Sequence, residues 1–203
     1  MLKTIEKAIF VGFLLTALIS MTNFSGRCDG ISDKILRFHI LANSDSKEDQ
    51  DLKLKVRDRI LNYCSPYFKD NVVDKQAAED VIKAHIDGIK SEAEDEIRIN
   101  GYDYPVNIIF TDMYFGTRKY KNTTIPSGKY RAMRVIIGDG NGHNWWCVMF
   151  PPMCLPAAQE REELSGILDS NEMDVVDNEC GYEVKFKVLE IFNCIKDLIS
   201  NML

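Results

Sequence analysis

The order of apolar and polar residues predicts a strand and two helices in the first half of the chain. Residues 35–41 alternate between apolar and polar side chains, the pattern of a half-buried strand. Ser46 then offers an N-terminal helix cap, and apolar residues recur at helical spacing from there to about Tyr63. A second apolar stripe predicts another amphipathic helix over residues 74–97.

The second half of the chain carries the two-residue period of a sheet. Glycines at 138, 140 and 142 separate two such segments, which predicts a turn that joins 129–137 to 144–150 as an antiparallel hairpin. Residues 159–179 are expected to hold a short helix and an exposed loop, and 189–202 a C-terminal helix. The segments expected to form strands here are 104–110, 129–137, 144–150 and 182–188, with 114–121 as a loop or irregular strand.

These elements predict an α+β fold of two layers. We expect a mostly antiparallel sheet of about four to five strands, with two helices after the first strand and a helix at the C-terminus.

The first 27 residues differ from the rest. Lys3 and Lys7 precede an uncharged, largely apolar stretch over residues 8–26, the pattern of an export signal. A bilayer needs about 20 apolar residues, so this stretch is marginal as a spanning helix. We therefore expect residues 1–27 to be an export signal or signal anchor and 28–203 to form a single soluble domain. Membrane contact would run through residues 8–26, before or without cleavage, and both outcomes remain open.

The charge of the chain changes which partners are plausible. The net charge is −6, and residues 28–203 alone carry 22 Lys and Arg against 30 Asp and Glu. A nucleic-acid partner is disfavoured, because phosphate binding needs a positive surface. No sequence motif for a cofactor or a metal site is present, so we expect neither.

The run from Gly138 to Cys154 holds the most unusual chemistry. Both tryptophans, Trp145 and Trp146, stand side by side there, directly after His143 and Asn144. Adjacent strand residues point to opposite faces, so one tryptophan is expected to enter the core and the other to face outward or into a groove. Aromatic residues dominate binding hot spots, which makes this run a candidate contact surface. The alternative is that helices cover both rings.

Two cysteines of this run could form a local disulfide. A turn at Pro151-Pro152 would bring Cys154 back toward Cys147. One alternative is two buried thiols, since free cysteine behaves as a small core hydrophobe. A zinc site with His143 is a weaker one, because the second close-spaced ligand pair of structural zinc sites is missing.

The alternative function from residue chemistry is a cysteine-dependent hydrolase. His143 would be the base and Cys147 the nucleophile, with Asp112 or Asp139 as the orienting group. Residues four apart on a strand lie about 13 Å apart, however, which is too far for a hydrogen bond. We therefore expect no catalytic residues and no enzyme activity.

Two blocks of the sequence resemble a known family. Residues 38–46 (Phe-His-Ile-Leu-Ala-Asn-Ser-Asp-Ser) form the first block, with the acidic and basic helix residues that follow them. Residues 126–130 (Pro-Ser-Gly-Lys-Tyr) and 142–148 (Gly-His-Asn-Trp-Trp-Cys-Val) belong to the second. Over roughly residues 35 to 190, the chain resembles the stage II sporulation protein R family of spore-forming Firmicutes.

This resemblance implies a secreted signalling protein with a signal peptide. Such a protein is made in the forespore and exported into the intermembrane space, where it acts as a protease activator. It would activate a membrane-embedded aspartic protease of the mother-cell septal membrane, stage II sporulation protein GA. That protease carries out sigma factor processing, the cleavage of the sigma factor E precursor. The alternative is an exported cysteine-dependent hydrolase in the same space.

The expected contact with the protease involves two segments. Asn43, Ser44 and Asp45 follow the first predicted strand, and His143, Asn144, Trp145 and Trp146 follow the glycine-rich turn. Both segments lie at strand ends or turns, where binding residues concentrate.

Overall fold

The computed structural model describes residues 2–68, 72–120, 123–154, 164–177 and 185–191, which form two compact units. The sheet unit comprises Ser32–Tyr114 and Lys129–Leu168. The terminal unit comprises Met1–Ile31, Phe115–Gly128 and Asp169–Leu203. The single soluble domain over 28–203 stays a prediction.

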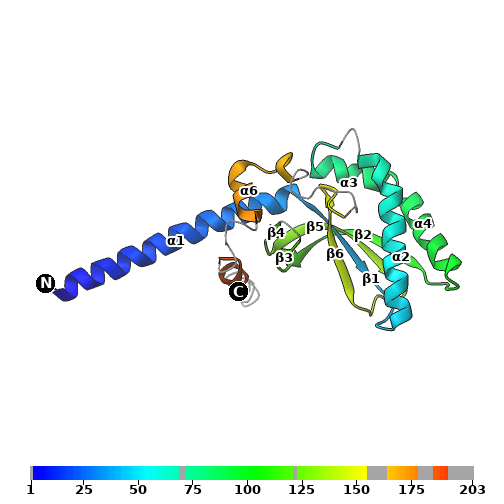
Figure 1. Ribbon diagram of the computed structural model, residues 1–203, viewed down its shortest axis with the longest axis horizontal. Helices are drawn as coiled ribbons and strands as arrows, with labels where there is room; N and C mark the ends of the chain where they lie inside the picture. Colours follow the sequence, from blue (N-terminus) through cyan, green and yellow to red (C-terminus); the bar gives the residue numbers. More distant parts are fainter. Residues whose placement is uncertain (1, 69–71, 121–122, 155–163, 178–184, 192–203) are drawn as a thin grey trace. The chain divides into compact units, whose positions relative to one another are not determined.

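The described elements follow one another along the chain as Figure 1 labels them. In chain order they are α1 (Leu2–Lys34), β1 (Leu36–Leu41), α2 (Lys47–Cys64), the short 3-10 helix η1 (Ser65–Phe68), α3 (Lys75–Ala84), α4 (Ile86–Ile99), β2 (Val106–Phe115), β3 (Arg118–Lys119), β4 (Thr124–Ile125), β5 (Gly128–Ile137), β6 (Asn144–Phe150) and α6 (Ser170–Val176).

The sheet unit is built on four strands in the order β2-β5-β1-β6. β1 runs parallel to β5 and antiparallel to β6, so the α+β fold is confirmed with a mixed sheet. The predicted hairpin between 129–137 and 144–150 is wrong, because β1 lies between β5 and β6. The expectation of a half-buried first strand is also wrong. All six residues of β1 are buried, because a central strand is covered on both faces.

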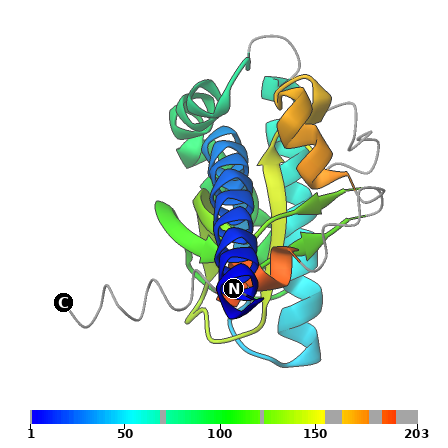
Figure 2. The same ribbon diagram turned by 90° about the vertical axis from the view of Figure 1, so that its left-hand side faces the viewer.

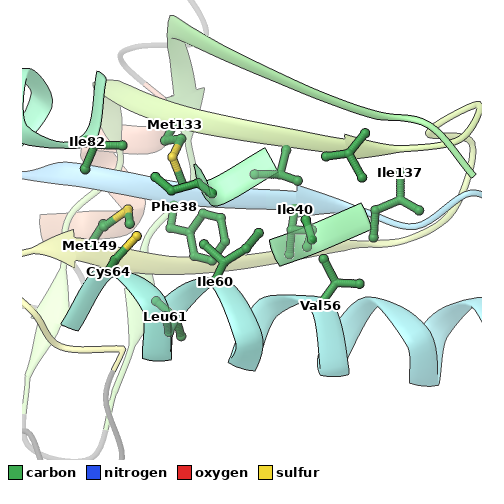
Figure 3. Close-up of a cluster of buried hydrophobic side chains, with 14 of the residues drawn as sticks. Phe38, Ile40, Val56, Ile60, Leu61, Cys64, Ile82, Met133, Ile137 and Met149 are labelled. Carbon is green, nitrogen blue, oxygen red and sulfur yellow. The ribbon is translucent and has the colours of Figure 1, made fainter. Parts of the chain in front are cut away.

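The helices α2, α3 and α4 cover one face of this sheet (Figure 1). α2 supplies one side of the core and β1 the other, and Figure 3 shows their side chains interdigitating. The apolar stripe of α2 is therefore buried against the strand that precedes it, as the helical spacing predicts. The residues labelled in Figure 3 are Phe38, Ile40, Val56, Ile60, Leu61, Cys64, Ile82, Met133, Ile137 and Met149.

The predicted helix over 74–97 is two helices, α3 and α4, separated at His85. His85 N donates to Ile82 O at 3.1 Å, a three-residue spacing that closes α3. His85 O then accepts from Ile89 N at 3.0 Å, which begins α4. The His85 ring lies 3.9 Å from the Tyr67 ring and 2.9 Å from Val81 O, so the side chain is held at the break.

In the terminal unit, residues 185–191 are helical, so the predicted strand is wrong over 185–188. Phe186 and Leu189 are both buried, and their three-residue spacing puts them on one helical face. The rest of that strand, 182–184, lies outside the described residues, as does 192–202 of the predicted C-terminal helix. β3 and β4 pair antiparallel in this unit, and Thr123 bridges to Asp177.

α1 is one continuous helix, seen close to its own axis in Figure 2. Its side chains are exposed from Lys3 to Ser20, whereas Phe24, Cys28 and Ile31 are buried. Among the described residues, α1 is the one helix long and apolar enough to cross a membrane, with a mean hydropathy of 1.8 in its most apolar window. This agrees with an export signal or anchor at the N-terminus.

Candidate functional site

The two predicted contact segments meet at one edge of the sheet. β1 and β5 are parallel, so the chain leaves both strands at the same edge. β6 is antiparallel to β1 and begins there, with Asn144 opposite Leu41. The topology therefore brings together segments that are about 100 residues apart in the sequence. We call Asn43–Asp45 and His143–Trp146 the joined-loop surface.

Backbone hydrogen bonds hold these two loops against each other. Asn141 N donates to Asn43 O at 3.1 Å, and Gly142 N donates to Ala42 O at 3.0 Å. The Asn43 side chain accepts from Asp139 N at 3.0 Å. A Cβ atom at Gly142 would lie 2.1 Å from Ser44 O, so only glycine allows this approach. The glycines thus build the turn that leads into β6.

Asp49, in the first turn of α2, holds the side chains of Asn43 and Ser44 in the first loop. Its side chain is buried and accepts from Ser44 Oγ at 2.6 Å and from Asn43 Nδ2 at 3.0 Å. Burial raises the pKa of Asp49, but the bonds from Ser44 and Asn43 outweigh it and lower the pKa overall. Asp49 therefore stays ionised and fixes both side chains.

An Asp–His contact joins the loops at the surface. Asp45 accepts from the backbone N and the ring Nδ1 of His143, and the ring bond lowers the pKa of Asp45. Below this contact, Lys53 Nζ donates to His143 O at 2.8 Å and to Gln50 Oε1 at 2.6 Å. Gln50 Nε2 in turn donates to Ser44 O at 2.9 Å. Lys53 thus connects α2 with both loops.

The adjacent tryptophans lie on opposite faces of β6, and both are half-buried. Trp145 meets Phe38 edge-on at 5.9 Å on the helix-covered face, and the Arg57 guanidinium lies 4.6 Å from its ring centre. Trp146 stacks on His39 at 4.2 Å on the other face. Trp145 therefore packs with the core, and Trp146 lies with the polar residues of the joined-loop surface.

His39 supports the second loop from the middle of the sheet. It is 2 % exposed, and its Nε2 lies 2.8 Å from Asn144 Oδ1. Burial lowers its pKa, so the neutral ring is favoured beneath Trp146. His39 thus positions two of the predicted contact residues.

The predicted contact residues include exposed side chains, whereas the residues that support them were not singled out from the sequence. Asp45, His143 and Asn144 are exposed, as a contact surface requires. Lys53 and Asp49 were missed, and the one signal in the sequence was a charged Lys53 next to the inward stripe of α2. It is 4 % exposed.

Cys147, in the middle of β6, and Cys154, four residues beyond its end, come together. The turn at Pro151-Pro152 brings their Cα atoms to 5.9 Å, within the range for a disulfide. We propose that they form this bond in the exported protein. Cys64 lines a small cavity with Cys154, and burial raises the pKa of its thiol to about 12.

The proposed catalytic pair does not assemble in the structure. The Cys147 sulfur lies against Cys154, while the His143 ring bonds to Asp45. Asp112, one candidate third group, pairs with Arg131 at 3.4 Å. In the described part of the chain, no group of three or more His, Cys, Asp or Glu side chains is placed to hold a metal ion.

Comparisons with known proteins place the chain in a family. The family model for stage II sporulation protein R matches residues 32–160. Stage II sporulation protein R of Bacillus subtilis (strain 168) is 32 % identical, over 84 % of this chain and 84 % of that protein. No solved structure matches the chain. The matched residues include the whole joined-loop surface and the strands that carry it. The chain therefore belongs to the stage II sporulation protein R family.

Proposed function

We propose that this chain is an exported sporulation signal that activates a membrane-embedded aspartic protease. The protein is made in the forespore, reaches the intermembrane space, and acts on stage II sporulation protein GA. The activated protease then processes the sigma factor E precursor. Membership in the family and the exposed apolar length of α1 support this proposal.

One observation carries the proposal at the level of residues. The topology and hydrogen bonds join Asn43–Asp45 to His143–Asn144 in one polar surface, with Asp45, His143 and Asn144 exposed. A preformed surface loses little conformational entropy on binding, which favours recognition of a protein partner. Nothing in this arrangement needs a chemical step on a substrate.

The joined-loop surface can act by a shift of populations. If the outer part of the protease has inactive and active arrangements, a ligand that binds the active one better turns it on. A change from about 1 % to about 99 % active needs a difference in affinity of about 10⁴-fold. Asp45, His143 and Asn144 would supply the polar contacts, and Trp146 the apolar one.

The first experiment is reconstitution in a non-sporulating host. We would co-express this chain, the protease and the sigma-factor precursor, with and without residues 1–27. We expect precursor cleavage only when this chain and its export segment are present. Cleavage that is independent of this chain, or none in any combination of stably made proteins, would contradict the proposal.

Substitutions then test the surface itself. His143→Ala with Asn144→Ala should reduce processing at least tenfold, because both side chains are exposed at the joined loops. Asp87→Ala, at an exposed position on α4, is the matched control and should process normally. Equal processing by the two proteins, with equal thermal stability, would remove the joined-loop surface from the mechanism.

The same assay separates the alternative hydrolase. A Cys147→Ser, Cys154→Ser protein that remains folded should still support processing. Complete loss of activity at wild-type stability would instead support the alternative hydrolase, with Cys147 as its nucleophile.

A further inference from the structure

A groove in the sheet unit lies away from the joined-loop surface. One cavity of about 540 Å³ and another of about 340 Å³ share Asp33, Lys75 and Gln76 in their walls. The two cavities therefore lie next to each other at the start of α3, and we call them together the groove. Its size is within the range of small-ligand and peptide sites.

The floor of the groove is a charge network that is already satisfied. Glu79 is 5 % exposed and receives a forked contact from Arg131, with distances of 2.7 to 3.1 Å. Lys83 approaches the same carboxylate at 2.8 Å, and Arg131 also reaches Asp112 at 3.4 Å. Hydrogen bonding from Arg131 holds the pKa of Glu79 at about 2, so the network stays ionised. Two cations and two carboxylates here balance each other.

Two further lysines that line the groove take no part in this ion-pair network. Lys75 and Lys129 both line the larger cavity. Within the described residues, neither amine is within ion-pair distance of a carboxylate. Lys75 is also the first residue of α3, where the helix dipole favours negative charge. The groove thus presents two available ammonium groups in a chain whose net charge is −6.

The smaller cavity adds an apolar end to the groove. Val73 and Ile167 line it, and Val73 is 76 % exposed. Val73 and Ile167 are the aliphatic side chains in this lining, so an apolar side chain of a ligand could pack there. The larger cavity therefore has a small excess of positive charge, with Lys75, Lys83, Lys129 and Arg131 against Asp33, Glu79 and Asp112, and the smaller one is partly apolar.

We propose that this groove binds an extended, acidic segment of another protein. Two carboxylates of the segment would meet Lys75 and Lys129, and an aliphatic side chain beyond them would pack on Val73 and Ile167. A nucleic acid fits less well, because its continuous line of phosphates could not avoid Asp33, whereas a peptide can space two carboxylates to meet Lys75 and Lys129. This site is separate from the proposed protease-activating surface and does not depend on it.

The test is fluorescence anisotropy with the full chain in lipid nanodiscs. The probe is a labelled peptide of about ten residues that contains Glu-Asp-Glu followed by Leu-Ile, and the comparison peptide replaces each acid by Lys. We expect micromolar binding of the acidic peptide only. The affinity should fall as salt is raised, because the contacts are ion pairs at the surface.

Variants then locate the site. Lys75→Gln with Lys129→Gln should weaken binding about tenfold, equivalent to about 1.4 kcal/mol. Lys55→Gln with Lys90→Gln is the matched control, since it removes the same charge from α2 and α4 outside the groove. Val73→Ser should weaken binding of the acidic peptide but leave its salt dependence unchanged. Circular dichroism confirms that each variant is folded.

Several results would overturn the proposal. These are equal binding of the acidic and basic peptides, equal loss in the two lysine pairs, or no binding of the acidic peptide up to about 1 mM. Tighter binding of a single-stranded oligonucleotide than of the acidic peptide would assign the lysines to a polyanion instead.

Discussion

At the scale of single residues, Gly142, directly before the joined-loop surface, lies where the two loops approach each other closely. A Cβ atom there would lie 2.1 Å from the backbone oxygen of Ser44 and 2.9 Å from Ala42 Cβ. Because the nearest obstacle is backbone, Gly142→Ala has to separate the two loops. We expect the free energy of unfolding to fall by about 1–3 kcal/mol, measured by urea denaturation.

The control for Gly142 is Gly116→Ala. A Cβ atom at Gly116 meets nothing within 4 Å, so we expect a change of less than about 0.5 kcal/mol. If both variants unfold at the wild-type urea concentration, the loops are not held together as described.

Glu79 gives the residue-scale prediction for pH. Hydrogen bonding from Arg131 lowers its pKa from 4.5 to about 2, so the folded protein binds fewer protons than the unfolded chain between these values. The contribution of Glu79 to stability is therefore present above pH 4.5 and is lost as the pH falls toward 2. We expect Glu79→Gln to be less stable than wild type near neutral pH and to lose less stability on acidification.

Urea denaturation over a pH series checks this expectation. Glu94→Gln removes a carboxylate that lies 3.8 Å from Lys90 on an exposed helix face and serves as the control. It should keep the wild-type pH dependence, because exposed pairs contribute little. A Glu79→Gln protein with an unchanged acid slope would show that the Arg131 contact does not hold in solution.

At the scale of elements, α1 has two parts with different surroundings. Phe13 is 71 % exposed, whereas Phe24 is 4 % exposed and packs on Phe186 at 5.6 Å. The second half of α1 is therefore part of the folded terminal unit. A signal peptidase that cut after Phe24 would remove a core side chain.

The same substitution at the two positions tests this division. Phe24→Ala should lower the stability of the purified full chain by about 3 kcal/mol, because it leaves a cavity. Phe13→Ala should change it by less than about 0.5 kcal/mol in a mild detergent. Thermal unfolding followed by circular dichroism measures both. Equal shifts at the two positions would mean that Phe24 is not in the core.

The elements also show which parts of the fold were predictable. α2 was, because its start depends on local chemistry: Ser46 Oγ accepts from Asp49 N at 3.1 Å, and the helix ends at Cys64 beside the expected Tyr63. The place of β1 between β5 and β6 was not. Alternation shows which residues share a face of a strand, but not which strands are neighbours.

The residues of the candidate site also divide into those that could be predicted from the sequence and those that could not. His143–Trp146 is unusual in sequence, and Asn43–Asp45 lies in a block that resembles the family, so both could be selected as a predicted contact surface. The role of Lys53 could not, because it depends on contact with His143 O, 90 residues away in the chain. Residues that support a site from a distant element look like ordinary helix residues until the fold is known.

At the scale of the whole molecule, the proposed Cys147–Cys154 bond reports on the compartment. Disulfides persist in oxidising compartments and are rare in the cytosol. We expect mass spectrometry of exported protein, alkylated without reduction, to leave these two cysteines unmodified. Reduction should lower the free energy of unfolding by about 2–3 kcal/mol.

Cys147→Ser with Cys154→Ser is the matched variant and should lose the effect of reduction. Cys28 and Cys64 are buried thiols and should react only after unfolding. Alkylation of Cys147 in the folded, exported protein would disprove the bond.

If the chain is exported as proposed, the central position of β1 also affects how it crosses the membrane. Leu36 pairs with Phe150, about 110 residues later in the chain, so the sheet stays incomplete until β6 is available. Pairing at such separation is slow compared with helix formation. On the proposed export route, a chain emerging N-terminus first from the ribosome has no finished core to unfold. On that route, the strand order would leave the chain unfolded enough to be translocated until β6 has been made, and the sheet would be completed after export.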